Sequence, residues 1–125
     1  MHILIADDDL ATRMELGGRL KQWGCRVTHA KDAMGAIQAI GTCPEIDLII
    51  VNWMMPGMDG MLFSKAIKAG ALHAQTLVMV GGRFRCQVEA EFPSWADGYI
   101  SKPLDFKALR ELLTKLAAIN RIPTA

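Results

Sequence analysis

Short apolar segments alternate with segments of helical periodicity along the whole chain. The apolar segments have the length of a strand, and the central run Ile46–Val51 is broken only by Asp47, which is typical of a strand buried on both faces. Each ends at polar or glycine residues. We predict five strands, at Ile3–Ala6, Cys25–Ala30, Ile46–Val51, Thr76–Val80 and Gly98–Ser101.

The segments between the strands place apolar residues three and four positions apart, which is the spacing of one helix face. We predict five helices, at Leu10–Trp23, at Ala33–Ile40 after an Asp32 N-cap, at Met61–Ala69, weakly at Arg83–Phe92, and from Phe106 to Leu116. Asp9 is also interpreted as an N-cap, and Gly24 as a helix stop. Gly17 and Gly18 lower the helix propensity of the first helical segment.

Alternating strands and helices indicate an α/β fold, because parallel neighbouring strands need crossover connections. We expect a doubly wound five-stranded parallel sheet with helices on both faces. The predicted domain covers residues 1–119, and residues 120–125 form a tail or the start of a linker. In such a sheet, ligands bind at the carboxyl ends of the strands.

Composition narrows the classes of protein further. The 125 residues carry 14 basic and 13 acidic side chains, a net charge of +1, which argues against a coat for nucleic acid or for an anionic membrane. No apolar run approaches the roughly 18–20 residues that span a bilayer. The three cysteines form no CxxC pair, so structural disulfides and zinc are not expected and a reducing cytoplasm is the natural setting.

The predicted strand ends carry the candidate chemistry. Asp7 and Asp8 follow the first strand, Asn52 the third, Gly81 the fourth and Lys102 the fifth. Adjacent carboxylates repel each other, so a pair at one strand end needs a cation such as Mg²⁺, which prefers oxygen ligands. A cation and the Lys102 ammonium in one cleft would suit a phosphoryl group. His2, His29 and His73 form no ligand pattern.

Three motifs carry a family resemblance. They are ILIADDD at Ile3–Asp9, DLIIVNWMMPGMDG at Asp47–Gly60 and ADGYISKPLDF at Ala96–Phe106. Together they resemble the receiver domains of two-component response regulators, from Ile3 to about Ala118. The resemblance implies a flavodoxin-like receiver fold, related to the chemotaxis regulators, and a role in phosphorelay signal transduction.

The resemblance also implies roles for single residues. Asp7 and Asp8 match the acidic pair that holds Mg²⁺, and Met54 matches the position whose backbone carbonyl is a further metal ligand. Lys102 matches the lysine that contacts the phosphoryl group, and its bond to Pro103 is expected to be cis. Tyr99 matches the aromatic switch residue on the face of the fourth helix, fifth strand and fifth helix.

Two positions depart from the family pattern. Asn52 stands at the phosphoacceptor aspartate, and a neutral amide is a very poor nucleophile. Asn52 also removes one negative charge from the metal cleft, so Mg²⁺ binding should be weak or absent. Gly81 stands where the family has a serine or threonine hydroxyl, although Gly81 and Gly82 are alternatively interpreted as a tight turn that needs positive φ.

The leading hypothesis is therefore a non-enzymatic receiver module that works through protein contacts without phosphorylation at position 52. One alternative is an ordinary Mg²⁺-dependent phospho-receiver in which a laboratory substitution introduced Asn52. A more remote one is a small phosphatase-like enzyme on the same fold. A chain of this length leaves no room for a DNA-binding effector, so we expect a single-domain regulator or a fragment.

The expected partners are a sensor histidine kinase or another signalling protein, with no direct nucleic-acid or membrane binding. A homodimer is also considered, through the face that carries Arg83, Phe84, Trp95 and Tyr99, because arginines and aromatics are common interface anchors. In the alternative interpretation, Phe84 and Trp95 fill core space beside Gly81.

Overall fold

The computed structural model describes residues 1–52, 55, 57, 59–70, 74–81 and 96–120. Its five strands are β1 (His2–Ala6), β2 (Arg26–Ala30), β3 (Leu48–Asn52), β4 (Gln75–Gly81) and β5 (Gly98–Lys102). All neighbouring strands pair in parallel, in the order β2-β1-β3-β4-β5. The predicted doubly wound parallel sheet is confirmed.

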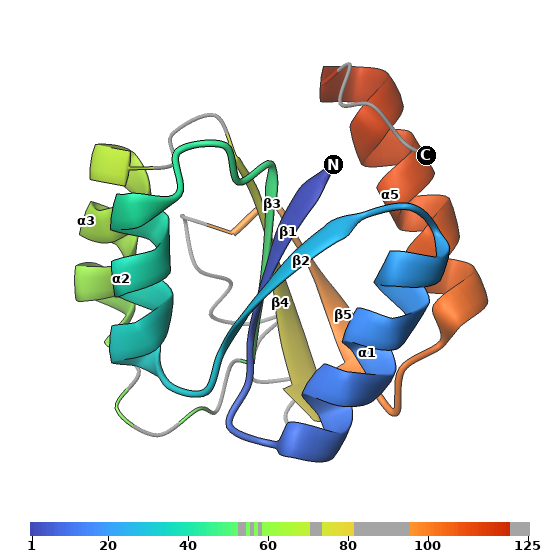
Figure 1. Ribbon diagram of the computed structural model, residues 1–125, viewed down its shortest axis with the longest axis horizontal. Helices are drawn as coiled ribbons and strands as arrows, with labels where there is room; N and C mark the ends of the chain where they lie inside the picture. The colour runs from blue at the N-terminus through green and yellow to red at the C-terminus, as the bar shows by residue number, and fades with distance from the viewer. Residues whose placement is uncertain (53–54, 56, 58, 71–73, 82–95, 121–125) are drawn as a thin grey trace.

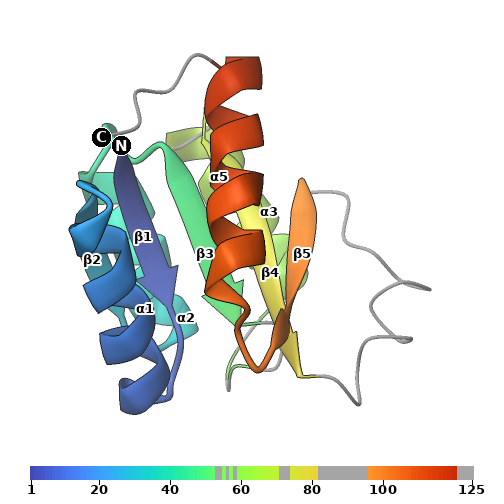
Figure 2. The ribbon, with the colours of Figure 1, turned by 90° about the vertical axis from the view of Figure 1, so that its right-hand side faces the viewer.

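Helices cover both faces of this sheet. The described helices are α1 (Leu10–Gln22), α2 (Ala33–Thr42), α3 (Gly60–Gly70) and α5 (Phe106–Asn120). Figure 1 shows the sheet between α2 and α3 on one side and α1 and α5 on the other, and Figure 2 shows the same layers from the side. The weakly predicted helix at residues 83–92 lies outside the described residues.

Two apolar layers hold the helices on the sheet. Leu4, Ile49 and Val78 point toward α2 and α3, where they pack with residues such as Phe63. Their chain neighbours, such as Ile3 and Ile50, point to the other face and pack with α1 and α5; that layer also includes Leu16, Leu109 and Leu113. Successive strand side chains alternate between faces, so a strand buried on both sides must be apolar throughout.

Most element boundaries differ from the predictions by one or two residues, whereas α5 continues to Asn120, beyond Leu116, the last residue of its predicted apolar face. Among the strands, β3 begins at Leu48 rather than at Ile46. Asp47, which precedes β3, forms two hydrogen bonds with His2 at the start of β1. Its backbone N–H donates to the carbonyl of His2, and its carboxylate accepts from the His2 backbone N–H at 2.8 Å. Asp97 has the same relationship to Thr76 before β5, with distances of 2.8 and 2.7 Å.

The ends of α1 and α2 agree with the predicted caps. The carboxylates of Asp9 and Asp32 accept hydrogen bonds from backbone N–H groups three residues on, at 3.1 and 2.7 Å. At the other end of α1, Gly24 has a φ of 86° and its N–H donates to the Lys21 carbonyl. This left-handed conformation is open to glycine at little cost and stops the helix.

The Gly17–Gly18 pair does not interrupt α1. Gly17 is buried, and a Cβ atom built on it would lie 2.9 Å from a ring carbon of His29 on β2. The loss of helix propensity at Gly17 therefore accompanies a close approach of α1 to β2, which a larger residue would obstruct. Within the described part of the chain, no helix is both long and apolar enough to cross a membrane.

Candidate functional site

The predicted site residues gather at the carboxyl edge of the sheet. Asp7 and Asp8 follow β1, Asn52 ends β3, and Gly81 and Lys102 are paired neighbours at the ends of β4 and β5. The parallel arrangement brings these strand ends to the same edge, as Figure 2 shows. Residues that are far apart in the sequence therefore lie close together there. We use the name cleft for the place where Asp7, Asp8, Asn52, Gly81 and Lys102 meet.

Asp7 is the buried centre of the cleft, with no exposed surface. One carboxylate oxygen, Oδ2, accepts from the Lys102 ammonium at 2.8 Å, and the other, Oδ1, accepts from the Asp9 backbone N–H at 2.9 Å. The 2.8 Å distance is typical of a charge-assisted hydrogen bond. The negative charge of Asp7 is thus matched by a partly buried ammonium.

Asn52 links the two aspartates. Its amide nitrogen Nδ2 donates to Oδ1 of Asp8 at 3.1 Å and, over a longer distance of 3.4 Å, to Oδ1 of Asp7. Both neighbours are acceptor oxygens, so the hydrogen-bond pattern places the NH₂ group toward them and the carbonyl away. Asn52 contributes hydrogen-bond donors to the point where an aspartate would contribute a third negative charge.

Asp9 has a different role from its two neighbours. Hydrogen bonds from the Thr12 hydroxyl and from the Thr12 backbone N–H lower the pKa of the exposed Asp9 carboxyl, because they favour its ionised form. A negative charge at a helix N-terminus is favourable, because it faces the positive end of the helix dipole. The interpretation of Asp9 as a cap is confirmed.

The backbone conformation of Gly81 contradicts one of the two interpretations of this residue. It is the last residue of β4, opposite Lys102 on β5, and it is not among the described glycines with positive φ, which are Gly24 and Gly57. The tight-turn interpretation of Gly81 is therefore wrong. Extended backbone does not require glycine, so the missing hydroxyl is not explained by backbone geometry.

Arg13 is a site residue that the sequence did not single out. Its guanidinium nitrogen Nη1 donates to the backbone carbonyl of Asp7 at 2.6 Å, which ties α1 to the end of β1. Its position in the sequence could have identified it. Long side chains of a helix point back toward the helix N-terminus, and Arg13 lies one turn inside α1.

Tyr99 on β5 is half-buried and packs against the core layer of α2 and α3. It also lines a hollow between β5 and α5 together with Pro103, Leu104 and Leu112. The peptide bond between Lys102 and Pro103 is cis, as the resemblance implied. Met54, Arg83, Phe84 and Trp95, which the sequence also proposed, lie outside the described residues.

The chain matches the family model of the response regulator receiver domain over residues 3–114. It belongs to this family. Among curated relatives, it is 34% identical over 125 residues to Protein PetR of Rhodobacter capsulatus, covering 99% of this chain and 51% of that protein. It is 31% identical over 121 residues to Response regulator MprA of Mycobacterium avium, covering 97% and 51%. The chain thus spans about half the length of these curated relatives.

Solved structures share the fold. A response regulator receiver domain from Clostridium thermocellum has a TM-score of 0.81 at 21% identity, with 97% of both chains covered. Full-length FixJ from B. japonicum has a TM-score of 0.77 at 27% identity, with 97% of this chain and 59% of that chain covered. The chain is a receiver domain of two-component signalling, a class of signalling module that interacts with histidine kinases or other signalling proteins.

Receiver domains generally bind Mg²⁺ at the acceptor site. The carboxylates of Asp7 and Asp8 are hard oxygen donors of the kind that Mg²⁺ prefers. However, Asn52 turns its NH₂ group, not its carbonyl, toward both of them. Within the described residues, no three His, Cys, Asp or Glu side chains group as metal ligands. The two aspartates fit a Mg²⁺ ion, and Asn52 fits one only after its amide rotates.

Proposed function

We propose that this receiver domain acts in two-component signalling as a protein-interaction module that takes no phosphate at position 52. The observation that carries the proposal is the placement of Asn52, whose amide nitrogen lies 3.1 Å from Asp8 and 3.4 Å from Asp7. The acceptor position therefore holds a neutral donor. Attack on a phosphoryl group needs an anionic carboxylate oxygen, which an amide does not supply.

The second departure supports the same proposal. A phosphoryl group bound near Asn52 would need a hydroxyl at the end of β4 to sense it, and Gly81 has no side chain. Lys102, the remaining phosphoryl-contacting residue of the family pattern, is already held by Asp7 at 2.8 Å. The acceptor carboxylate at position 52 and the hydroxyl at position 81 are thus both absent, and the Lys102 ammonium forms an ion pair with Asp7.

We also propose that Mg²⁺ binds this cleft weakly. Asp7, Asp8 and the carbonyl oxygen of Asn52 would hold the ion, with the backbone of Met54 as a further proposed ligand. When bound, Mg²⁺ would neutralise the two carboxylates. The Asn52 amide would first give up its two hydrogen bonds, and the site would have one negative charge fewer than the family pattern.

Intact mass spectrometry tests the central proposal. The protein is incubated with Mg²⁺ and acetyl phosphate, and no adduct of about 80 Da is expected. The Asn52→Asp protein, treated in parallel, should show that adduct, because Asp7, Asp8 and Lys102 remain in place to support phosphoryl transfer. An acid-labile adduct on the wild-type protein, lost in Asn52→Ala, would overturn the proposal.

We propose a sensor histidine kinase or another signalling protein as the partner, in a cytoplasmic setting, and no catalytic activity. A homodimer through the face that carries Tyr99 is proposed as well, because the hollow between β5 and α5 lies there. Sedimentation equilibrium tests the homodimer: Tyr99→Glu should dissociate it, with circular dichroism confirming that the variant is folded. A wild-type protein that stays monomeric at all concentrations would contradict it.

A further inference from the structure

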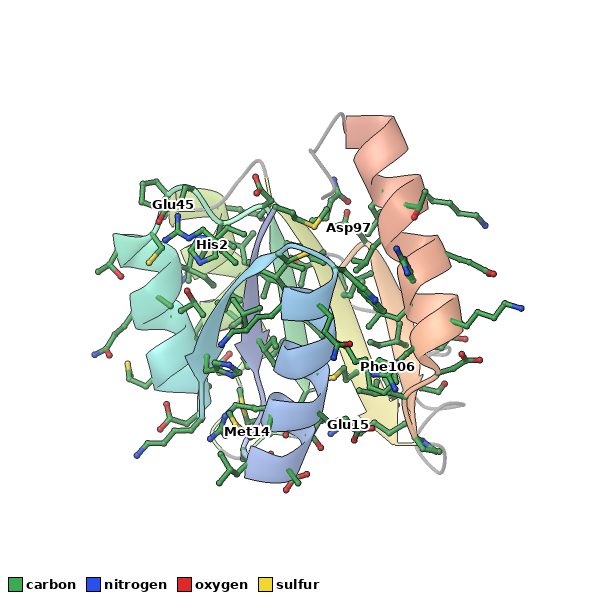
Figure 3. The ribbon with its side chains drawn as sticks, turned by 45° about the vertical axis from the view of Figure 1, so that its right-hand side comes forward. His2, Met14, Glu15, Glu45, Asp97 and Phe106 are labelled. Atoms are coloured by element: carbon green, nitrogen blue, oxygen red, sulfur yellow. The ribbon has the colours of Figure 1, made fainter. Side chains whose placement is uncertain are left out.

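A groove between α1 and α5 lies apart from the cleft. Its lining consists of three basic and two aromatic side chains: Arg19 and Trp23 from the α1 end, and Phe106, Lys107 and Arg110 from the start of α5. We call it the α1/α5 groove. Figure 3 shows Phe106 at the base of α5, on the side toward α1.

Two cation–π contacts connect α1 with α5 in this groove. The guanidinium of Arg19 on α1 lies 4.7 Å from the ring centre of Phe106 on α5. The guanidinium of Arg110 on α5 lies 5.5 Å from the ring of Trp23 beside α1. A cation–π contact restrains a guanidinium group over a ring while its outer N–H donors stay available. Both arginines are thus held in position although they are exposed.

Among the described residues, the positive charges of the groove form no ion pair. In the described part of the chain, no carboxylate lies within ion-pair distance of Arg19, Lys107 or Arg110, although Glu15 and Glu111 are on the same two helices. The partly buried Lys102, in contrast, is neutralised by Asp7. In a chain with a net charge of only +1, three cations that pair with no carboxylate of the described residues form a local positive surface in this groove.

We propose that the α1/α5 groove binds an acidic segment of a partner protein. Arginine and tryptophan are enriched among the residues that dominate binding energy at protein interfaces. Carboxylates would pair with the ordered guanidinium groups, and apolar side chains of the segment would lie against the exposed parts of the rings. A nucleic acid is disfavoured as the occupant, because a phosphate backbone requires a longer basic stripe than these three residues form.

Fluorescence anisotropy with a defined probe tests the groove. The probe is a short fluorescein-labelled peptide of alternating glutamate and leucine, and its control is the same peptide with glutamine for glutamate. The glutamate peptide should bind and the glutamine peptide should not. Raising the salt from about 50 to about 300 mM should weaken binding, because exposed charges are screened.

Charge reversal locates the binding site. The double variant Arg19→Glu with Arg110→Glu should raise the Kd of the peptide about tenfold or more. The matched control is Lys65→Glu with Lys68→Glu on α3, which makes the same charge change on the opposite face of the sheet. That control should change the Kd by about twofold at most. Equal effects of the two variants would overturn the proposal.

Further variants and probes make each outcome decisive. Circular dichroism checks the fold of the reversed variant, and the milder pair Arg19→Lys with Arg110→Lys should weaken binding about two- to threefold by losing the planar stacking. Failure of the folded wild-type protein to bind the glutamate peptide at low salt would overturn the proposal. Stronger binding of a single-stranded thymidylate oligonucleotide would overturn it too, in favour of nucleic acid.

This inference is independent of the proposal about Asn52. The anisotropy experiment contains neither Mg²⁺ nor phosphodonor, and none of its substitutions touches the cleft. A phosphate adduct on the wild-type protein would overturn the proposal for Asn52 and leave the groove result unchanged. A lack of peptide binding would overturn the proposal for the groove and leave the proposal for Asn52 unchanged.

Discussion

The ammonium of Lys102 lies 2.8 Å from the carboxylate of Asp7, a side chain with no exposed surface. The two residues are separated by 95 positions in the chain and join the ends of β1 and β5. A carboxylate that is buried without a partner is strongly unfavourable, so this ion pair is part of what holds the carboxyl edge of the sheet together.

Replacing Lys102 by methionine should therefore lower the free energy of unfolding by about 2–4 kcal/mol, because it leaves the Asp7 charge buried and unpaired. Urea denaturation measures the loss. The double variant Asp7→Asn with Lys102→Met removes both charges and should recover a large part of the stability. The single variant Asp7→Asn is measured as well. If the loss of unfolding free energy in the double variant equals the sum of the losses in the two single variants, the residues are not energetically coupled.

Replacing Asn52 by aspartate should make the stability of the protein depend on Mg²⁺. The substitution removes the amide donor to Asp7 and Asp8 and adds a third carboxylate, which should cost about 1–3 kcal/mol in the presence of EDTA. Added Mg²⁺ should restore this loss and raise the Tm, whereas the wild-type Tm should respond weakly.

The control for this experiment is Gln38→Glu, which makes the same chemical change on the exposed surface of α2. Differential scanning calorimetry with and without Mg²⁺ compares the three proteins. A wild-type Tm that rises with Mg²⁺ as much as that of Asn52→Asp would show that the Asn52 amide does not hinder the ion.

Asp97 should stabilise the amino edge of the sheet through its side chain. Its carboxylate accepts the Thr76 backbone N–H at 2.7 Å, which would otherwise lack a partner at the start of β4. Asp97→Ala should cost about 1–2 kcal/mol in chemical denaturation, while Asp97→Asn keeps an acceptor oxygen and should cost less. Equal losses in the two variants would contradict a role for the hydrogen bond.

His2 should make the protein less stable in mild acid. Burial lowers the pKa of His2 from its usual 6.5, and the nearby Arg26 lowers it further, although Glu45 and Asp47 act in the opposite direction. Figure 3 shows His2 and Glu45 close together at this edge of the sheet. The folded protein therefore takes up the His2 proton at a lower pH than the unfolded chain, in which His2 has its usual pKa of 6.5. Its contribution is therefore complete above that pKa and decreases as the pH falls.

Urea denaturation at a series of pH values from about 8 to about 5.5 measures this dependence. The slope should be smaller in His2→Gln, which does not titrate in this range. His29 shifts in the same direction through partial burial and the charges of Arg13 and Lys21, so some slope should remain. An unchanged slope in His2→Gln would show that His2 is not the titrating group.

Much of the fold could be predicted from local pattern. The apolar runs around Leu4, Ile49 and Val78 predicted strands buried on both faces, because only such strands need apolar side chains on both sides. The caps at Asp9 and Asp32 were also readable, since a short acidic side chain before a helical period satisfies free N–H groups. Boundaries were less predictable: Asp47 reads as part of a strand, but its hydrogen bonds to His2 place it before β3.

The chain alone determined which chemical groups stand at the strand ends: two adjacent aspartates, an asparagine, a glycine and a lysine. Only the tertiary structure decided how they pair. The choice of Lys102 as partner of Asp7, the turn of the Asn52 amide toward both aspartates and the reach of Arg13 to the Asp7 carbonyl depend on distances between strands and helices that are remote in sequence. The same holds for the cation–π contacts of Arg19 and Arg110, because side-chain orientation across two helices follows from their packing on the sheet and not from local periodicity.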